Sequence, residues 1–437
     1  MKIAFVIPGD PSFGQQQYPL GIAYLAALAE GVGHECKIFD EIAGDDVQEE
    51  FRSYRPDIAC FTGTTMYISN VYEHTAFVRK ELPGTKIILG GPHVSAMPEE
   101  AIKHADIVFR NESEGNFLQA IEGKLPNGVH EGEYVKDLDT LPFPAYRLLK
   151  LDHYLAQKDR IVGFDKKVAS IITSRGCPWK CTFCYNSFRE NPVRFHSADR
   201  VIKEIGLLQK EFSIEGLYFC DDEFMLKPKR LAEICDYLKK EKLVWECQAQ
   251  VRSVLRHPEV IKIIKDAGCV LLAVGFESGS ERVLNDLKQG ASTVAMNQEV
   301  IDLCKSEGMP VHGTFMIGNP GETMDDIKLT EKFINKNRGT LKYVSVLKTT
   351  PFPGTQIWHQ CIESGVLKPP FNWREFDCGP DAPRANEFLS NDEIVREVKR
   401  INMVQTLKNY SLLQIIKRVW RYRRFLMNYL PSFRSKA

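Results

Sequence analysis

Three cysteines set close together are the residues of this chain best suited to do chemistry. Cys177, Cys181 and Cys184 form the pattern C-x3-C-x2-C within the run RGCPWKCTFCY at 175–185. Three thiolates in this frame can bind three irons of a [4Fe–4S] cube and leave the fourth iron without a protein ligand. An open position of this kind distinguishes a catalytic metal from a structural one. A structural zinc site would need a fourth ligand, and His196 and Cys220 lie outside the usual spacing.

Aromatic residues frame the third cysteine, with Phe183 before it and Tyr185 after it. The resulting C-x3-C-x-aromatic-C-aromatic pattern resembles the radical S-adenosylmethionine (SAM) enzymes. The resemblance implies that SAM binds the open iron and is cleaved to a 5'-deoxyadenosyl radical, which takes a hydrogen atom from the substrate. It assigns the three cysteines and Tyr185 to catalysis, and Phe183 and Tyr185 to the SAM site. The cofactors supply this chemistry, and the protein supplies orientation and a dry cavity.

Length and composition are typical of a large soluble enzyme. The chain has 437 residues, 43% of them hydrophobic, and a formal net charge of zero, which predicts two or three domains. Nine of the twelve cysteines lie outside the triplet without regular spacing, and the sequence begins with no signal peptide. We therefore expect a reducing, cytoplasmic location. No run of about eighteen apolar residues predicts a membrane span. Because a cluster with an open iron is sensitive to oxygen, an anaerobic host is expected.

Residues 1–123 predict a doubly wound α/β domain. Short apolar runs rich in β-branched residues alternate with helical patterns, which indicates a parallel sheet with helices on both faces. Ligands bind such a sheet at the carboxyl ends of its strands. No G-x-G-x-x-G motif follows the first strand, which argues against nicotinamide binding. The expected strands are Lys2–Pro8, Glu35–Asp40, Pro56–Thr62, Thr85–Gly90 and Asp106–Arg110.

Glycines and hydroxyl side chains collect where these strands end, and they resemble the cobalamin-binding domain that precedes the radical SAM barrel in one subfamily. The matching segments are Gly33–Glu35, Gly90–His93 and Glu112–Gly115. None of the ten histidines lies in D-x-H-x-x-G, so the resemblance implies cobalamin without a histidine on cobalt, and His93 at the corrin edge. Gly90–His93 alone could also be an ordinary turn. The implied cobalamin residues are Gln17, Tyr18, Leu20, Thr64, Thr65, Gly90, Gly91, His93, Val94, Glu112, Ser113 and Glu114.

The remainder of the chain predicts a linker, a barrel and an extension. Residues 124–166 lose periodicity and gain proline and glycine, which marks an inter-domain linker. From 167 to 348, six strand–helix units predict the open (β/α)6 barrel of radical SAM enzymes, with the cysteine loop after its first strand. Active sites of such barrels lie at the carboxyl ends of the strands. The expected barrel strands are 168–173, 214–220, 244–249, 269–276, 311–317 and 342–347.

Polar residues near these barrel strand ends resemble the SAM-binding motifs of the family. Asp222 follows the second strand, where the family contacts the SAM amino group, and Gln250 follows the third. Glu277 and Ser278 form a G-x-E-S motif after the fourth strand, and His312 lies on the fifth. The resemblance implies that these five residues belong to the SAM pocket. Helix capping is the alternative for some of the polar residues in these loops.

Residues 349–437 predict a C-terminal extension with a basic amphipathic helix. No acidic residue follows Glu397, whereas ten lysines and arginines do, interleaved with aromatic residues. Such a segment could contact an acidic protein substrate, nucleic acid or an anionic membrane surface, so a membrane-peripheral location is open, or it could be a closing helix with solvated charges. Nucleic-acid binding is not expected, because the second cysteine triplet of the tRNA-methylthiolating relatives is absent.

These features predict a cobalamin-dependent radical SAM methyltransferase. The resemblance implies methylcobalamin as methyl donor, a 5'-deoxyadenosyl radical that activates the substrate carbon, and an external electron donor such as flavodoxin or ferredoxin. Within the family the acceptor can be a protein side chain, a peptide, a lipid or a tetrapyrrole. A radical SAM cyclase or coupling enzyme with the same cofactors is the alternative. A non-catalytic cobalamin carrier or sensor is disfavoured, since a carrier has no use for the cysteine triplet.

Overall fold

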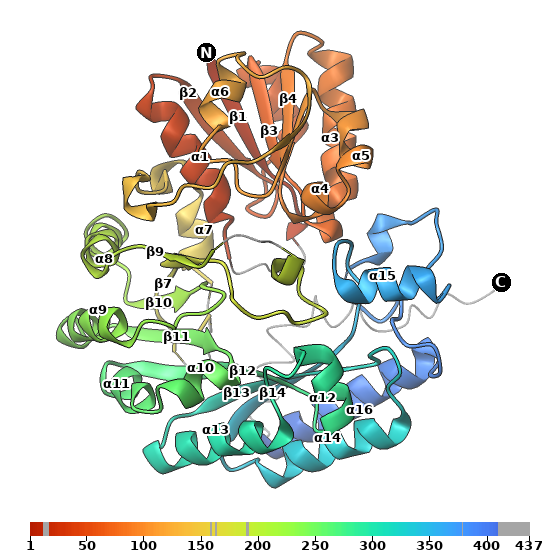
Figure 1. Cartoon of the computed structure of the whole chain (residues 1–437). Coiled ribbons are helices and arrows are strands. Elements are labelled where there is room, and N and C mark those ends of the chain that lie inside the picture. Colours follow the sequence, from red (N-terminus) through yellow and green to blue (C-terminus); the bar gives the residue numbers. More distant parts are fainter. Residues whose placement is uncertain (12–16, 158–159, 162–163, 189–191, 378, 410–437) are drawn as a thin grey trace.

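Two parallel sheets organise the chain (Figure 1). The computed structural model describes residues 1–437 except 12–16, 158–159, 162–163, 189–191, 378 and 410–437. Each sheet has six strands, and a small antiparallel pair formed by β8 (Ser174–Arg175) and β9 (Arg194–Phe195) flanks the cysteine loop. The predicted α/β class, with an N-terminal doubly wound domain followed by a partial barrel, is confirmed.

The first sheet has the strand order β2-β1-β3-β4-β5-β6, and all its neighbouring strands are parallel. Its central strands are buried on both faces, which explains their nearly continuous apolar runs. Five strands agree with the sequence expectation, and the sixth, β6, lies in the segment expected to be a linker. The strands are β1 (Lys2–Ile7), β2 (Glu35–Asp40), β3 (Ile58–Thr62), β4 (Lys86–Gly90), β5 (Ile107–Arg110) and β6 (Gly128–Glu131).

Helices cover both faces of this sheet. One face packs against α1 (Leu20–Gly31) and α6 (Phe117–Ile121). The other packs against α2 (Val47–Tyr54), α3 (Ile68–Glu81) and α4 (Pro92–Ala96), and the short α5 (Pro98–Ala101) follows α4. The strand order reverses between β2-β1 and β3, so a crevice forms at the carboxyl ends of β1 and β3.

The second sheet forms an open barrel with the strand order β14-β13-β12-β11-β10-β7, again all parallel. The strands are β7 (Val168–Ile171), β10 (Gly216–Phe219), β11 (Val244–Ala249), β12 (Cys269–Glu277), β13 (Val311–Ile317) and β14 (Leu341–Lys348). The outer helices are α8 (Ala198–Phe212), α9 (Pro228–Lys240), α10 (Val251–Arg256), α11 (Val260–Asp266), α12 (Glu281–Lys288), α13 (Val294–Glu307) and α14 (Met324–Lys336).

The segment between the two sheets is packed rather than loose. It contains the short helix α7 (Leu151–Leu155), and its tyrosines hydrogen-bond to both bodies. The Tyr146 hydroxyl donates to Glu204 on α8 at 2.6 Å, and the Tyr154 hydroxyl donates to Asp40 on β2 at 2.8 Å. These buried contacts tie the first sheet to the first helix of the barrel.

The segment after the barrel returns to the N-terminal body. Helix α15 (Gln356–Glu363) and the turn that carries Trp373 pack into the same hydrophobic core as α3 and α4. The Trp373 indole donates to Glu100 at 2.8 Å. Helix α16 (Asn391–Asn409) then packs against the edge strand β14, where the Asn402 side chain bonds the amide and carbonyl of Val346.

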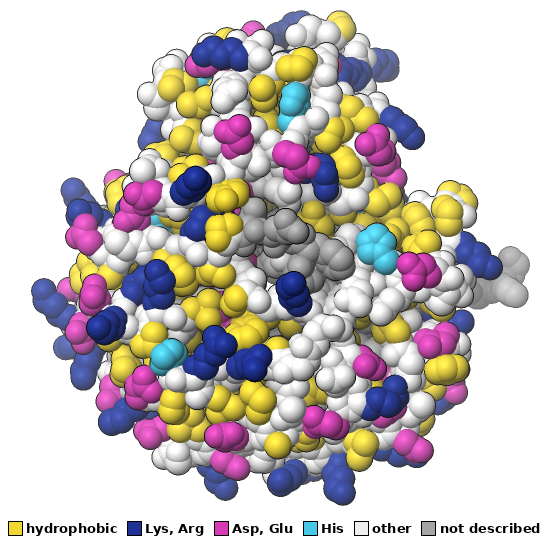
Figure 2. Space-filling model, in the orientation of Figure 1, with side chains coloured by type: hydrophobic (Ala, Val, Ile, Leu, Met, Phe, Trp, Pro, Cys, Tyr) yellow, Lys and Arg dark blue, Asp and Glu magenta, His cyan; other side chains and the backbone are white. Residues whose placement is uncertain are grey.

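The predicted basic run from Lys417 onward lies outside the described residues. Among the residues that are described, no helix is long and apolar enough to cross a membrane. Charged side chains of both signs are interspersed on the face shown in Figure 2, in keeping with the formal net charge of zero.

Candidate cofactor and active site

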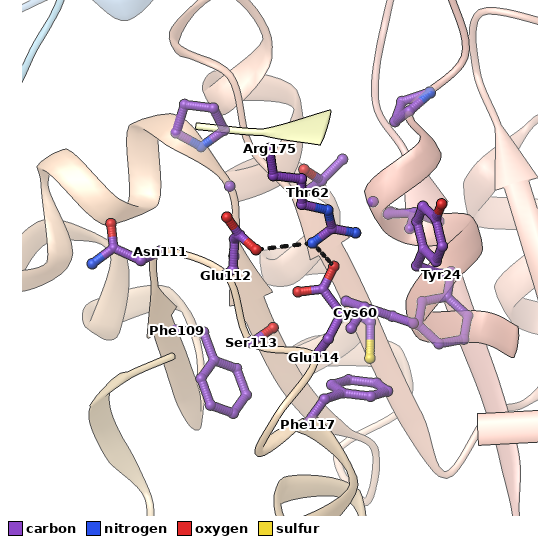
Figure 3. Close-up of a pocket in the computed structure, with 18 of the residues that line it drawn as sticks. Tyr24, Cys60, Thr62, Phe109, Asn111, Glu112, Ser113, Glu114, Phe117 and Arg175 are labelled. Atoms are coloured by element: carbon purple, nitrogen blue, oxygen red, sulfur yellow. Dashed lines mark hydrogen bonds and ion pairs between the residues drawn. The ribbon is translucent and has the colours of Figure 1, made fainter. Parts of the chain in front are cut away.

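A cavity of about 330 Å³ lies at the carboxyl ends of the first sheet and is also lined by the start of the barrel (Figure 3). Its walls come from both bodies of the chain. The N-terminal body contributes residues of β1, β3, β4, β5, α1 and the loop after β5, and the barrel contributes residues after β7 and β10. The barrel side is formed by Ile172, Ser174, Arg175, Gly176, Cys220 and Asp222.

The wall of the cavity is apolar in one part and charged in another. Phe109, Phe117 and Cys60 supply apolar lining, whereas Glu112 and Glu114 lie beside Arg175 (Figure 3). A cavity with this division suits a large cofactor that has a flat apolar part and a polar rim. The residues therefore fit cobalamin. No histidine is among the described residues that line the cavity. That cobalamin binds without a histidine on cobalt stays a prediction.

Gly91 shows why glycine is required at the end of β4. Its φ angle of +103° is one that side-chain-bearing residues rarely adopt, and a Cβ atom there would lie 2.8 Å from the Gly63 nitrogen. The glycine thus allows two strand-end loops to approach each other beside the cavity. Gly90 and Gly91 both line the cavity, as the sequence predicts.

Ion pairs join the loop after β5 to the cysteine loop (Figure 3). Arg175 Nη1 lies 3.0 Å from Glu112 Oε2 and 2.5 Å from Glu114 Oε1, and Arg194 Nη2 lies 2.6 Å from Glu112 Oε1. All four side chains are largely buried. Burial alone would raise the Glu112 pKa, but the two guanidinium groups lower it overall, so this carboxylate stays charged. Glu112 and Glu114 therefore hold the two bodies in register as well as line the cavity.

Two residues assigned to cobalamin from the sequence have other contacts. The Tyr18 hydroxyl both donates to the carbonyl and accepts from the amide of Ser170, each at 2.9 Å, so Tyr18 extends the edge of β7. The His93 ring is buried, with Nδ1 3.1 Å from the Thr65 hydroxyl and its plane edge-on to Trp373. Neither residue lines the 330 Å³ cavity. Their positions indicate structural roles.

The remaining predicted cobalamin residues divide in the same way. Ser113 lines the cavity, whereas Leu20 and Val94 are buried core residues and Gln17 is exposed and interacts with Tyr218. Thr64 and Thr65 line a second cavity of about 400 Å³, described below.

The three cysteines pack around one small apolar cluster with Trp179 and Ala291. Because all three cysteines pack in this one cluster, they lie close to one another. Burial raises the pKa of the Cys177 thiol to about 12. Among the described residues no three His, Cys, Asp or Glu side chains converge on a single metal ion. An iron–sulfur cube makes a different demand, because each thiolate binds a different iron, and the arrangement fits it.

The cysteine loop is anchored by buried groups from the barrel. The Trp179 indole donates to Glu223 Oε2 at 3.2 Å, and the same carboxylate accepts from the Ser253 hydroxyl at 2.8 Å. The Thr182 amide donates to the Leu287 carbonyl at 2.9 Å. These contacts attach the loop to α10, to α12 and to the segment after β10. They thereby also fix the positions of the cysteines in the loop.

Glu277 and Lys288 form a buried ion pair next to the cysteine loop. Lys288 Nζ lies 2.9 Å from Glu277 Oε1, with side-chain exposures of 4% and 8%, and 5.4 Å from the centre of the Phe183 ring. Burial opposes the charge on Lys288, but the Glu277 carboxylate outweighs it and raises the lysine pKa. Glu277 has a φ of +60°, uncommon for a residue with a side chain. A Cβ on Gly275 would overlap its carboxylate, which explains the glycine of the G-x-E-S motif.

The other predicted SAM residues are placed around this pair with different contacts. Asp222 is exposed and lines the first cavity, whereas the neighbouring Asp221 and Glu223 are buried in hydrogen bonds. Gln250 caps α10 through its side-chain oxygen, and its buried Nε2 has no hydrogen-bond partner in the described part of the chain. A ligand acceptor could satisfy this amide. Asp222 and Gln250 therefore fit a SAM pocket.

Ser278 and His312 contribute differently. The Ser278 hydroxyl lies 3.1 Å from that of Thr330 on α14 and is fully buried, so it fixes helix packing. His312 Nε2 lies 2.8 Å from the Ser345 hydroxyl, and burial lowers the pKa of His312, which keeps the ring neutral near pH 7. Phe183 and Tyr185 line the second cavity.

Several residues of the site were not predicted from the sequence, namely Arg175, Arg194, Trp179 and Lys288. Arg175 lies beside the cysteine motif and Trp179 lies within it. Their position in the sequence could therefore have indicated that they belong to the site. Arg194 and Lys288 carry no local signal, because their partners, Glu112 and Glu277, lie 82 and 11 residues away on other elements.

The second cavity, of about 400 Å³, lies between β3, the cysteine loop and the turn that follows the barrel. We call it the aromatic cavity. It is lined by Thr64, Thr65, Met66, Tyr67, Pro92, Phe183, Tyr185, Phe352, Pro353 and Thr355.

Comparison with known proteins agrees with this site. Residues 171–334 match the radical SAM superfamily, and residues 11–121 match the B12 binding domain. The chain is 31% identical over 421 residues to an uncharacterized methyltransferase of Pyrococcus horikoshii, with 89% of each chain covered. It is 25% identical over 475 residues to the anaerobic magnesium-protoporphyrin IX monomethyl ester cyclase of Rubrivivax gelatinosus, covering 99% of this chain and 82% of that one.

Among solved structures, the cobalamin-dependent S-adenosylmethionine radical enzyme OxsB with aqua-cobalamin and SAM bound superposes with a TM-score of 0.65 at 18% identity. The match covers 78% of this chain and 53% of that chain, which supports the fold. The chain therefore belongs to the radical SAM enzymes that carry a cobalamin-binding domain, and within them it is a methyltransferase. Its cofactors are a [4Fe–4S] cluster, SAM and cobalamin.

Proposed function

We propose that this methyltransferase acts on an unactivated carbon, at a position reached from both cofactor sites. The observation that supports this proposal is the shared 330 Å³ cavity. Its walls include Gly90 and Glu114 of the cobalamin-binding body and Gly176, the neighbour of Cys177 in the cysteine loop. When bound, cobalamin supplies the methyl group and the cluster with SAM supplies the radical that activates the carbon.

In this proposal the residues of the chain bind the cluster, SAM and cobalamin, orient them and shield them from water. Cys177, Cys181 and Cys184 would hold the cluster, and Trp179 with its Glu223 contact would fix their loop. These anchors are buried and attach the loop directly to the barrel, which limits its freedom to move.

SAM would be held by residues from three further strand ends. Gln250 offers its unpartnered amide, Asp222 offers a carboxylate at the cavity, and the Glu277–Lys288 pair offers both charges beside the cysteine loop. Tyr185 would lie next to the reacting groups from the opposite side, where it lines the aromatic cavity. Preorganised charges of this kind in a buried site are worth more than in water.

The test is product analysis of anaerobically reconstituted holoenzyme supplied with SAM, a reductant and extracts that contain candidate acceptors. Methyl transfer by this route should give 5'-deoxyadenosine and S-adenosylhomocysteine together, with a mass gain on the acceptor carbon when the SAM methyl is isotopically labelled. Formation of S-adenosylhomocysteine alone would refute the radical step. Untargeted mass spectrometry of a deletion strain would then identify the acceptor.

Cyclisation or coupling without net methyl transfer is the second candidate, favoured by the similarity to the monomethyl ester cyclase. It predicts 5'-deoxyadenosine without S-adenosylhomocysteine. The same product analysis therefore separates the two functions.

An external donor such as flavodoxin or ferredoxin would reduce the cluster, in a cytoplasmic and anaerobic setting.

The basic extension would contact a protein or membrane-borne acceptor, and its residues after Asn409 lie outside the described part of the chain. Helix α16 is structural up to Asn409, because Ile401 is fully buried and Arg400 pairs with Glu331 at 2.6 Å. Truncation after Asn409 is therefore the informative variant for this contact.

A further inference from the structure

The aromatic cavity is lined by four segments that are distant in sequence: three supply most of its walls, and Pro92 at the start of α4 is the fourth. A 3-10 turn after β3 (Thr65–Tyr67), the cysteine loop and the turn after the barrel each supply one wall. The side chains that dominate these walls are Met66, Tyr67, Phe183, Tyr185, Phe352 and Pro353. Each body of the chain and the extension thus contribute to one cavity of about 400 Å³, a size typical of small-molecule sites.

No charged side chain is among the described residues that line the aromatic cavity. Two of its threonine hydroxyls are also engaged by the protein itself. The Thr65 hydroxyl lies 3.1 Å from His93 Nδ1. The Thr355 hydroxyl donates to the Phe352 carbonyl at 2.8 Å and accepts from the Trp358 amide at 3.1 Å. The walls therefore present mostly carbon and aromatic faces.

The walls are held in place by close packing. Gly354 has a φ of +79°, and a Cβ atom there would lie 2.7 Å from the Tyr185 ring and 3.0 Å from Ala96 Cβ. The Ile357 amide donates to the Thr182 carbonyl at 3.1 Å, which links the turn after the barrel to the cysteine loop. The aromatic cavity is therefore formed by ordered backbone.

The aromatic cavity adjoins both cofactor sites. Pro92 lines it and also lines the 330 Å³ cavity of the cobalamin-binding body. Phe183, which also lines it, precedes Cys184 in the cysteine loop. A molecule in the aromatic cavity would therefore lie next to the groups that supply the methyl and the radical.

We propose that the aromatic cavity binds an uncharged, apolar ring system of the methyl acceptor, which makes the substrate class hydrophobic ring compounds. This inference rests on the proposed methyl transfer for its role. Aromatic walls gain both buried area and ring–ring contacts from such a group. A charged group would lose its hydration without gaining a partner.

The experiment compares two probes with the same ring skeleton on the holoenzyme loaded with cluster, cobalamin and SAM. Neutral N-phenyl-1-naphthylamine and anionic 8-anilinonaphthalene-1-sulfonate are each measured by equilibrium dialysis, which coloured cofactors do not disturb. The neutral probe should bind once per chain and at least about tenfold more tightly than the sulfonate, a difference of about 1.4 kcal/mol.

Substitutions then place the probe in the aromatic cavity. Phe352→Glu should weaken binding of the neutral probe about tenfold or more, while Phe352→Leu keeps it within about threefold. Phe388→Glu is the matched control, because it makes the same chemical change at a side chain that is 68% exposed and lies outside the cavity. If Phe352→Glu does not fold, Met66→Glu places the same charge on another wall.

Three results would overturn the proposal: equal affinity for the two probes, equal loss in the Phe352→Glu and Phe388→Glu proteins, or neutral-probe binding that is seen in protein without cobalamin or SAM but is absent in the loaded holoenzyme. The last result would assign the cavity to a cofactor. Loss of S-adenosylhomocysteine formation with intact probe binding would refute the proposed function alone. Intact methyl transfer without probe binding would refute this inference alone.

Discussion

Replacement of Lys288 by methionine tests the electrostatic account of the SAM region. Methionine keeps much of the lysine stem, so packing changes little, but Glu277 loses a partner 2.9 Å away while both side chains are over 90% buried. Breaking a buried ion pair on one side typically costs about 3–5 kcal/mol, since the remaining charge is left without compensation. We expect a loss of this size in the free energy of unfolding of the barrel.

Thermal unfolding of the cofactor-free protein measures this loss. For a unit of roughly 150–250 residues, each kcal/mol shifts the melting temperature by about 2–4 °C, so the barrel transition should fall by about 6–20 °C. The double variant Glu277→Gln with Lys288→Met removes both charges and should recover most of this decrease. Lys328→Met is the matched control, because the Lys328–Asp325 pair is 67% and 87% exposed and should shift the transition by no more than about 2 °C.

An uncompensated buried carboxylate is contradicted if Lys288→Met melts within about 2 °C of the wild type. It is also contradicted if the double variant is as unstable as the single one. In that case lost packing, and not an uncompensated carboxylate, would explain the effect.

Other expectations concern pH, the domain contact and the cluster. Burial raises the Glu322 pKa to about 7, so the folded state favours the protonated acid. The free energy of unfolding of the wild type should therefore fall by about 3 kcal/mol between pH 4.5 and pH 8. Glu322→Gln should not show this decrease, and melting temperatures across the pH range measure the difference. Arg175→Met should lower cobalamin content at least severalfold while iron content stays unchanged, and equal loss of both would point to global misfolding. Replacement of Cys177, Cys181 and Cys184 by alanine should abolish the cluster, and iron near four per chain would contradict the assignment.

Local patterns predicted the strands well because each core strand carries its own signal. The barrel strand at 311–317, for example, has the bounds expected from its apolar run. Strand β6 (Gly128–Glu131) was missed because a short, half-exposed edge strand pairs on one side only and needs little hydrophobicity. Its sequence therefore looks like a loop.

The site was predicted where chemistry is encoded locally and missed where it depends on distant partners. The cysteine triplet and the Gly90–Gly91 turn act through their own backbone and spacing. Glu112 gives no sign in the sequence that it faces Arg175, which lies 63 residues further along the chain. The contact of His93 with Trp373 could not be predicted either, because Trp373 comes from the extension.

The return of the extension to the N-terminal body has a consequence for how the chain is made. Trp358, Trp373 and Phe376 share one core with α3 and α4, yet they emerge from the ribosome after the whole barrel. The N-terminal body is therefore synthesised with one apolar flank uncovered, and it acquires its final cover only when translation has passed residue 376. A fragment that ends at residue 123 would keep this flank exposed, so the cobalamin-binding body should be expressed together with residues 356–376.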